Sequence, residues 1–128
     1  MQTKIRVLLV DDHTLVRKAL AGHIQKNPDI TIVGEASDGK AGVNLARELR
    51  PDIVLMDISM PVMDGVEATR IIHSELPDTH IIGLSMFESD EQGEAMIDAG
   101  AVAYLTKSGP PSALFEQIHA WSRRAKAA

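Results

Sequence analysis

Short runs of apolar, mostly β-branched residues alternate along the chain with segments whose apolar residues recur at helical spacing. The first run, Ile5–Val10, is nearly continuous and stops at two aspartates, which is typical of a strand buried on both faces. From Leu15 to Ile24, apolar residues then return every three or four positions, as on one face of a helix. This alternation repeats to the end of the sequence and predicts a succession of strand–helix units.

Turn and cap residues delimit the units. Asp64 is a suitable N-cap for a helix, Gly100 is a suitable helix stop, and Pro51 ends the helix before it. The predicted strands are Ile5–Val10, Ile30–Glu35, Ile53–Met56, Ile81–Leu84 and Val102–Leu105. The predicted helices run through Leu15–Ile24, Gly39–Leu49, Val66–Leu76, a segment that follows the polar stretch Glu88–Glu91 and passes through Ala95, Met96 and Ala99, and Leu114–Trp121.

Strands that alternate with helices over short loops form a parallel sheet, because right-handed crossovers place the helices on its faces. We therefore expect an α/β fold with a doubly wound, five-stranded parallel sheet and helices on both faces. The flavodoxin-like strand order 2-1-3-4-5 is the expected topology. Residues 1–128 are expected to form a single domain, in which Arg123–Ala128 are a frayed helix end or the start of a linker.

Composition narrows the functional classes. The net charge of −5 argues against nucleic-acid binding by this domain itself. The absence of cysteine excludes disulfides and thiolate metal sites. The N-terminal apolar run of about six residues is too short for a signal sequence or a membrane span, so we expect a cytoplasmic protein without membrane contact.

Polar residues with useful chemistry follow the predicted strands. Asp11 and Asp12 follow the first strand, Asp57 the third, Ser85 the fourth, and Lys107 closely follows the fifth. In open α/β sheets, ligands bind beyond the carboxyl ends of the strands, where these five groups would meet. Any one of them alone would more often be a cap, a turn former or a surface residue. The complete set at the strand ends indicates a functional site.

Three clustered carboxylates repel one another unless cations lie beside them. Lys107 is one available cation, and Mg²⁺ is the divalent ion that carboxylates, water and phosphate oxygens suit best. A carboxylate can attack phosphorus to form an acyl phosphate. Mg²⁺, Lys107 and the Ser85 hydroxyl could neutralise the oxygens of the transferred group.

Four segments closely resemble the response regulator receiver family of two-component signalling. They are VLLVDDH at Val7–His13, DIVLMDISMPVMDG at Asp52–Gly65, GLS at Gly83–Ser85 and YLTK at Tyr104–Lys107. The resemblance covers essentially the whole chain. The finer pattern is similar to the NarL/FixJ-type subfamily, on the basis of Leu15-Val16-Arg17 after His13, VGEASDG at Val33–Gly39, and Pro110-Pro111 after Lys107-Ser108.

The resemblance implies that Asp57 accepts a phosphoryl group from a phosphohistidine of a sensor histidine kinase or phosphotransfer protein. It also implies that Asp12 binds Mg²⁺ directly and Asp11 through water. Asp57 and the Ser59 backbone carbonyl would complete the protein ligands.

The family further implies a conformational switch that controls an output domain or partner, most often in transcription regulation. Lys107 would pair with Asp57 and later with the phosphate, Ser85 would move toward the phosphoryl oxygens, and Tyr104 would then pack inward. Without the resemblance, Tyr104 is interpreted as a half-buried aromatic of a strand. The resemblance also suggests a homodimer, through helices 1 and 5 or through the face of helix 4, strand 5 and helix 5.

Two residues depart from the family pattern. Ser108 follows Lys107 where many members have a proline after a cis bond, so we do not expect a cis bond here. Met86 stands where many members have a small residue. We hypothesise that Met86 narrows access to the acyl phosphate and slows water attack, with Ser59 as the other residue that governs access and phosphate lifetime.

The site residues are also compatible with other functions. The main hypothesis is a switch that catalyses only its own phosphorylation and dephosphorylation, and so is not a turnover enzyme. The alternative is an aspartate-nucleophile phosphatase, which expects a second aspartate where this chain has Ser59. A small-molecule-binding module and a receiver that no longer uses phosphate are further rivals. The five histidines, scattered without metal-ligand spacing, are expected at the surface, and Trp121 either at the edge of the core or exposed to a partner.

Overall fold

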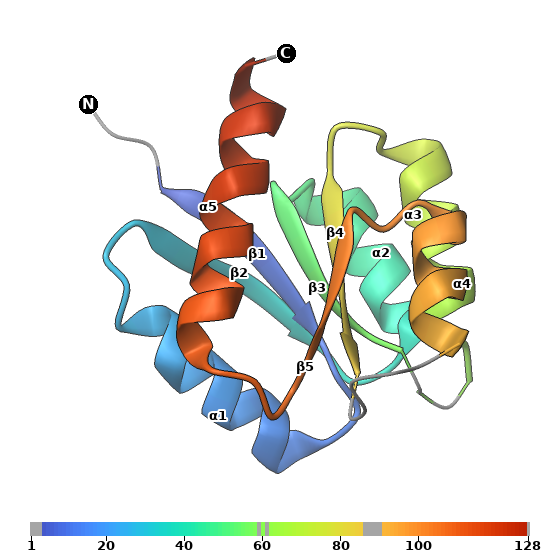
Figure 1. Cartoon of the computed structure of the whole chain (residues 1–128). Helices are drawn as coiled ribbons and strands as arrows, with labels where there is room; N and C mark the ends of the chain where they lie inside the picture. Colours follow the sequence, from blue (N-terminus) through green and yellow to red (C-terminus); the bar gives the residue numbers. More distant parts are fainter. Residues whose placement is uncertain (1–3, 59, 61, 86–90, 128) are drawn as a thin grey trace.

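The computed structural model describes residues 4–58, 60, 62–85 and 91–127, and the side chains of all these except 91, 92 and 123–127. Five strands alternate with five helices (Figure 1). The strands are β1 (Ile5–Val10), β2 (Ile30–Ala36), β3 (Ile53–Asp57), β4 (His80–Ser85) and β5 (Ala103–Thr106). The helices are α1 (Thr14–Gln25), α2 (Gly39–Leu49), α3 (Gly65–Glu75), α4 (Glu91–Ala99) and α5 (Pro111–Ala127).

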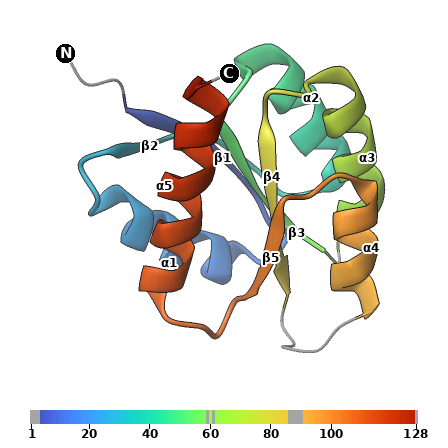
Figure 2. The same cartoon turned by 45° about the horizontal axis from the view of Figure 1, so that its top comes forward.

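The five strands form one parallel sheet in the order β2-β1-β3-β4-β5, which confirms the predicted topology. Helices α1 and α5 cover one face, and α2, α3 and α4 cover the other (Figure 2). Because parallel crossovers are right-handed, the covered face changes where the chain reverses its direction across the sheet, which it does after β2.

Two apolar layers hold the helices to the sheet. Alternate β1 side chains point into each layer, with Leu8 and Val10 on one side and Val7 and Leu9 on the other. The central strands therefore carry nearly continuous apolar runs. The edge strands β2 and β5 are half-buried for most of their length.

The predicted boundaries hold to within about two residues for most elements. Asp64 is the N-cap of α3, where its side chain accepts a hydrogen bond from the Glu67 N–H. Gly100 follows α4 with a φ of +122°, a conformation that favours glycine. Every peptide bond of the described residues is trans, including Lys107–Ser108.

The last helix is longer than the sequence pattern predicted. α5 continues through Ala127, so the described part of Arg123–Ala128 is helical rather than a linker. Arginine, alanine and lysine favour helices, and no glycine or proline follows Pro111. Trp121 is half-buried against the α1–α5 layer, and its Nε1 donates to Gln117 Oε1 at 3.0 Å. Its ring lies 5.3 Å from the His80 ring, which places it at the edge of the core.

The helices were compared with the length and hydropathy of a membrane-spanning segment. None of the helices in the described ranges combines the length and the apolar character that a bilayer crossing requires.

Candidate functional site

The carboxyl ends of neighbouring strands bring the predicted site residues together. β1 and β3 pair in register up to Val10 and Met56, so Asp11 and Asp57 follow side by side. The arrowheads of β1, β3 and β4 point toward the same lower edge in Figure 1. Lys107 reaches this edge from β5, and its backbone N–H donates to the Ser85 carbonyl oxygen at 2.7 Å.

Lys107 forms a buried ion-pair cluster with two aspartates. Its Nζ lies 2.9 Å from Asp11 Oδ2 and 3.0 Å from Asp57 Oδ1, and the three side chains are 5 %, 0 % and 4 % exposed. One ammonium thus faces two buried carboxylates, with Asp12 beside them, and the site keeps an excess of negative charge.

Burial raises the pKa of Asp57 to about 6, because the carboxylate loses its hydration. The charge of Lys107 lowers this pKa, and the neighbouring Asp11 raises it again. Near neutral pH, Asp57 is therefore mostly ionised although it is buried. A carboxylate in this state has a strong requirement for a further cation.

The donor atoms fit a divalent metal. One ligand atom from each of Asp11, Asp12, His13 and Asp57 lies within 4.8 Å of the others. Asp57 Oδ2 and Asp12 Oδ1 are buried and accept no hydrogen bond from the described part of the chain. Unpaired buried carboxylate oxygens are costly unless a cation takes the place of the missing donors. The cluster could therefore hold a metal, and its oxygen-rich donors suit Mg²⁺.

His13 was not identified from the sequence as part of this group. The histidines were expected at the surface, and His13 is exposed as predicted, although one of its ring nitrogens lies with the carboxylate oxygens of the cluster. The signal that could have revealed it is its position directly after Asp11 and Asp12. His13 is the N-cap residue of α1, and its Nδ1 lies 3.1 Å from Asp12 Oδ1.

The loop after β1 is held by hydrogen bonds to the backbone. The Asp11 N–H donates to the Ala36 carbonyl oxygen at 3.0 Å, and the His13 N–H donates to Asp11 Oδ1 at 2.9 Å. The Arg17 guanidinium donates to the Asp11 carbonyl oxygen at 2.7 Å and to Glu35 Oε1 at 3.1 Å. Arg17 is a positioning residue that only the tertiary structure identifies.

The loop after β3 returns closely over the strand end. The Gly65 N–H donates to the Ile58 carbonyl oxygen at 2.9 Å, and the Ile58 N–H donates to the Leu84 carbonyl oxygen at 3.1 Å. A Cβ at position 65 would overlap the backbone carbonyl of Asp57. Glycine is therefore required there for the loop to approach Asp57.

The predicted switch residues lie on neighbouring strands. Ser85 ends β4, is 3 % exposed and pairs in register with Thr106 of β5. The half-buried Tyr104 ring lies against Gly93 of α4, where a Cβ would come within 2.6 Å of two ring atoms. Ser59 and Met86, the two residues expected to affect access, lie outside the described residues.

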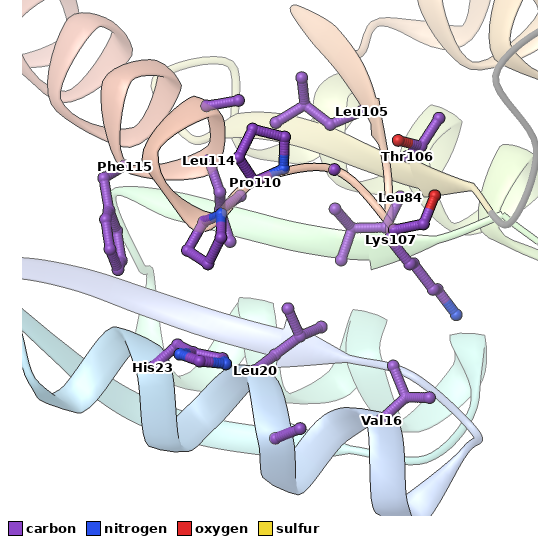
Figure 3. Close-up of a pocket in the computed structure, with 15 residues that line it drawn as sticks. Val16, Leu20, His23, Leu84, Leu105, Thr106, Lys107, Pro110, Leu114 and Phe115 are labelled. Carbon is purple, nitrogen blue, oxygen red and sulfur yellow. The ribbon is translucent and has the colours of Figure 1, made fainter.

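An apolar cavity of about 560 Å³ lies between α1 and α5 (Figure 3). Its lining includes Val16, Leu20, Leu105 and Phe115. The Lys107 side chain borders the cavity, and in Figure 3 it extends away from Leu114 and Phe115. The residues of the acidic cluster are not part of the lining, so the cavity adjoins the predicted phosphate site only through Lys107.

The fold and the acidic strand ends are those of a signalling receiver. The chain belongs to the response regulator receiver family, since the model of the response regulator receiver domain matches residues 7–119. Its relatives include transcription regulators of the LuxR/NarL type, as the finer sequence pattern predicted.

The transcriptional regulatory protein LiaR of Bacillus subtilis is 49 % identical over 119 residues, which are 93 % of this chain and 56 % of that protein. A LuxR-family two-component response regulator from Aurantimonas is 36 % identical with a TM-score of 0.88, covering 94 % of this chain and 86 % of that one. A receiver domain assigned to NarL of Mycobacterium tuberculosis is 29 % identical with a TM-score of 0.88, covering 94 % and 98 %. The chain thus spans about half the length of LiaR.

Proposed function

We propose that this receiver domain is a phosphorylation-controlled switch and that Asp57 is its phosphoacceptor. A sensor histidine kinase or phosphotransfer protein would donate the phosphoryl group in a Mg²⁺-dependent reaction. The observation that carries the proposal is the state of Asp57, which is 4 % exposed, paired through Oδ1 with Lys107 and without a hydrogen-bond donor from the described residues at Oδ2. Such a carboxylate is held in place and still has a free oxygen.

The chemistry follows from these contacts. A carboxylate oxygen of Asp57 attacks phosphorus, the phosphorus–nitrogen bond to the donor imidazole breaks, and an acyl phosphate forms. When bound by Asp11, Asp12, Asp57 and the Ser59 carbonyl, Mg²⁺ would neutralise charge on the transferred group. Lys107 holds the nucleophile in place and is within reach of a phosphoryl oxygen attached to it.

The switch would run from Asp57 through Ser85 to Tyr104. Ser85 ends β4, the strand next to β3, and this position supports a role in which its hydroxyl moves toward a new phosphoryl oxygen. Tyr104 lies on the next strand, with its ring between β5 and α4. We propose that movement of Ser85 changes the packing of Tyr104 and thereby the surface offered to an output domain, a partner or a second copy.

The names of the similar proteins suggest which output this domain controls. LiaR is named as a transcriptional regulatory protein, and this chain matches about half of it. We propose that the domain controls a transcription-regulating output, makes no nucleic-acid contact itself, and works in the cytoplasm.

A direct test is intact mass after incubation with acetyl phosphate and Mg²⁺. We expect one added phosphoryl group on the native chain and none on Asp57→Asn, because the amide cannot attack phosphorus. Asp38→Asn is a matched control, since Asp38 is the N-cap of α2 and not part of the acidic cluster. The proposal is refuted by a native chain that gains no phosphoryl mass.

The alternative, an aspartate-nucleophile phosphatase, predicts different kinetics. A phosphatase turns over p-nitrophenyl phosphate many times, whereas a switch is labelled once and then loses the group slowly. Ser59 in place of the expected second aspartate supports the switch. Sustained turnover that Asp57→Asn abolishes would favour the phosphatase.

The lifetime of the acyl phosphate is proposed to depend on Met86. Met86→Ala should shorten the half-life of the phosphorylated domain because a smaller side chain admits water more easily. Met86→Leu, which keeps the side-chain volume, should leave it nearly unchanged. The measurement is the decay of phosphorylated protein by intact mass, and an alanine variant no faster than native would contradict the hypothesis.

A further inference from the structure

We propose that His13 extends the acidic cluster into a mixed oxygen–nitrogen metal site. With its imidazole as a ligand, the site would accept transition metals such as Mn²⁺ and Ni²⁺ more readily than three carboxylates alone. The inference rests on the metal site of the proposed function and adds to it a residue that selects the metal.

The spacing of the donor atoms is that of metal ligands. His13 Nδ1 lies 3.1 Å from Asp12 Oδ1 and 3.4 Å from Asp11 Oδ1. In an octahedral site with bonds of about 2.1 Å, adjacent ligand atoms are about 3 Å apart and opposite ones about 4.2 Å. The four donor atoms of the cluster all lie within 4.8 Å of one another, which is close to the separations in such a site.

The imidazole is not placed there by a hydrogen bond. Asp12 Oδ1 accepts no hydrogen bond from the described residues, although His13 Nδ1 is only 3.1 Å away. The oxygen of Asp11 nearest to the imidazole already accepts the backbone N–H of His13. An independent feature points to a missing cation, namely the buried Asp57 Oδ2, which has no donor from the described part of the chain.

The backbone positions the His13 side chain beside the carboxylates. His13 is the N-cap residue of α1, and its carbonyl oxygen accepts the Arg17 N–H at 2.8 Å. In the described residues its side chain makes no capping hydrogen bond, which leaves the imidazole available for another partner. The side chain is 57 % exposed, so it can turn toward an entering ion without unfolding the loop.

The chemistry of the ligands determines which ions benefit. Mg²⁺ prefers oxygen ligands and gains little from imidazole. Nickel and zinc ions suit imidazole nitrogen, Mn²⁺ accepts it beside its preferred oxygen ligands, and for a given site the affinity rises from Mn²⁺ to Ni²⁺. His13 should therefore add affinity for these ions while leaving Mg²⁺ binding unchanged.

The first experiment detects the nitrogen ligand directly. Mn²⁺ is added to the native chain, and electron spin echo envelope modulation is recorded for coupling to ¹⁴N. We expect nitrogen coupling in the native chain and in His119→Gln, a control histidine on α5, but none in His13→Gln. Coupling absent from the native chain, or retained in His13→Gln, overturns the inference.

The second experiment compares affinities. Calorimetric titration with Ni²⁺ and with Mg²⁺ should show roughly a tenfold or greater loss of Ni²⁺ affinity in His13→Gln, since even outer-shell partners contribute that much. Mg²⁺ affinity should stay unchanged, and excess Mg²⁺ should compete with Ni²⁺ in the native chain. Equal losses for both ions would show that His13 only shapes the loop and would overturn the proposed selectivity.

The two proposals fail in different ways. A native chain that binds no Mg²⁺ contradicts the metal site of the proposed function. A native chain that binds Mg²⁺ but shows the same ratio of Ni²⁺ to Mg²⁺ affinity as His13→Gln contradicts only the role of His13.

Discussion

The Asp57 carboxylate is buried, and the nearby ammonium of Lys107 compensates its negative charge only in part. Its pKa is raised to about 6 by lost hydration, although Lys107 lies 3.0 Å away and opposes the shift. A group whose pKa is higher in the folded state than in the unfolded state keeps its proton more tightly when folded. The structure therefore tolerates ionised Asp57 at a cost in stability, and a metal or a phosphoryl group can remove that cost.

The free energy of unfolding of the native chain should fall relative to that of Asp57→Asn as the pH rises from 3.8 to about 6. These limits are the ordinary pKa of an aspartate and the raised pKa of Asp57. The folded chain binds more protons than the unfolded chain in this window, so ionisation of Asp57 destabilises the fold. A shift of about two pKa units corresponds to about 3 kcal/mol. The measurement is urea unfolding of both chains across pH 3.5 to 7.5 without metal.

Added Mg²⁺ is the control, because an ion that favours the carboxylate should reduce the difference above pH 6. A difference between the two chains that does not change with pH would contradict the burial of an ionised Asp57.

Lys107→Met should be strongly destabilising. It leaves the buried carboxylates of Asp11 and Asp57 without their ammonium, and the loss of one partner from a buried ion pair costs about 3–5 kcal/mol. The effect should be largest above pH 6, where Asp57 is ionised in the native chain. Denaturant unfolding of Lys107→Met, Asp57→Asn and the double variant measures the coupling. Additive effects of the two changes would contradict the ion pair.

At the scale of elements, the helices owe their positions to close approaches that only small residues allow. Gly93 lies where α4 meets the Tyr104 ring of β5, and Gly65 lies where the start of α3 passes over β3. Both contacts border the predicted switch. The glycine pattern alone does not reveal them, because Gly22 of α1 has the same helical context and nothing near its missing side chain.

Gly22→Ala and Gly93→Ala form a matched pair. Alanine favours a helix over glycine by up to about 1 kcal/mol, and at position 22 a Cβ meets no atom within 4 Å, so Gly22→Ala should be stabilising. Gly93→Ala should be destabilising, because its Cβ would lie 2.6 Å from Tyr104 ring atoms and the ring must move. Thermal unfolding measures both changes.

The Tyr104→Leu background provides the control for Gly93. With the ring removed, the penalty of Gly93→Ala should shrink. An equal penalty with and without the ring would show that the contact with Tyr104 is not its cause.

At the scale of the whole molecule, the sheet has an apolar layer on each face and the acidic cluster at the carboxyl ends of its strands. The site residues come from the ends of β1, β3, β4 and β5, and each strand is packed between both layers or at the sheet edge. An ion at that edge binds side chains that only the folded chain brings together. Metal binding should therefore stabilise the fold as a unit.

Mg²⁺ should raise the unfolding temperature of the native chain. A ligand that binds only the folded state adds roughly 2.7 kcal/mol at a concentration a hundredfold above its Kd. Asp12→Asn should weaken this effect, because Asp12 contributes an oxygen to the cluster. Asp64→Asn, which changes an N-cap outside the cluster, should keep the effect. An unfolding temperature that Mg²⁺ does not alter would contradict the metal site.

The sequence by itself determined the elements and the edge where the chemistry lies. Apolar periodicity is a local property, and it placed β1 and α2 at Ile5–Val10 and Gly39–Leu49 as the structure has them. Residues that directly follow parallel strands must gather at one edge, which identified Asp11, Asp57 and Lys107 without knowledge of any distance.

Only the tertiary structure decided how these groups interact. Loop paths and strand register determine that Lys107 lies within 3.0 Å of Asp57, that burial raises the pKa of Asp57, and that the Tyr104 ring lies against Gly93. The approach of His13 to Asp12 also depends on the first turn of α1. Distances of this kind depend on contacts between segments far apart in the chain, and hydrophobic periodicity carries no information about them.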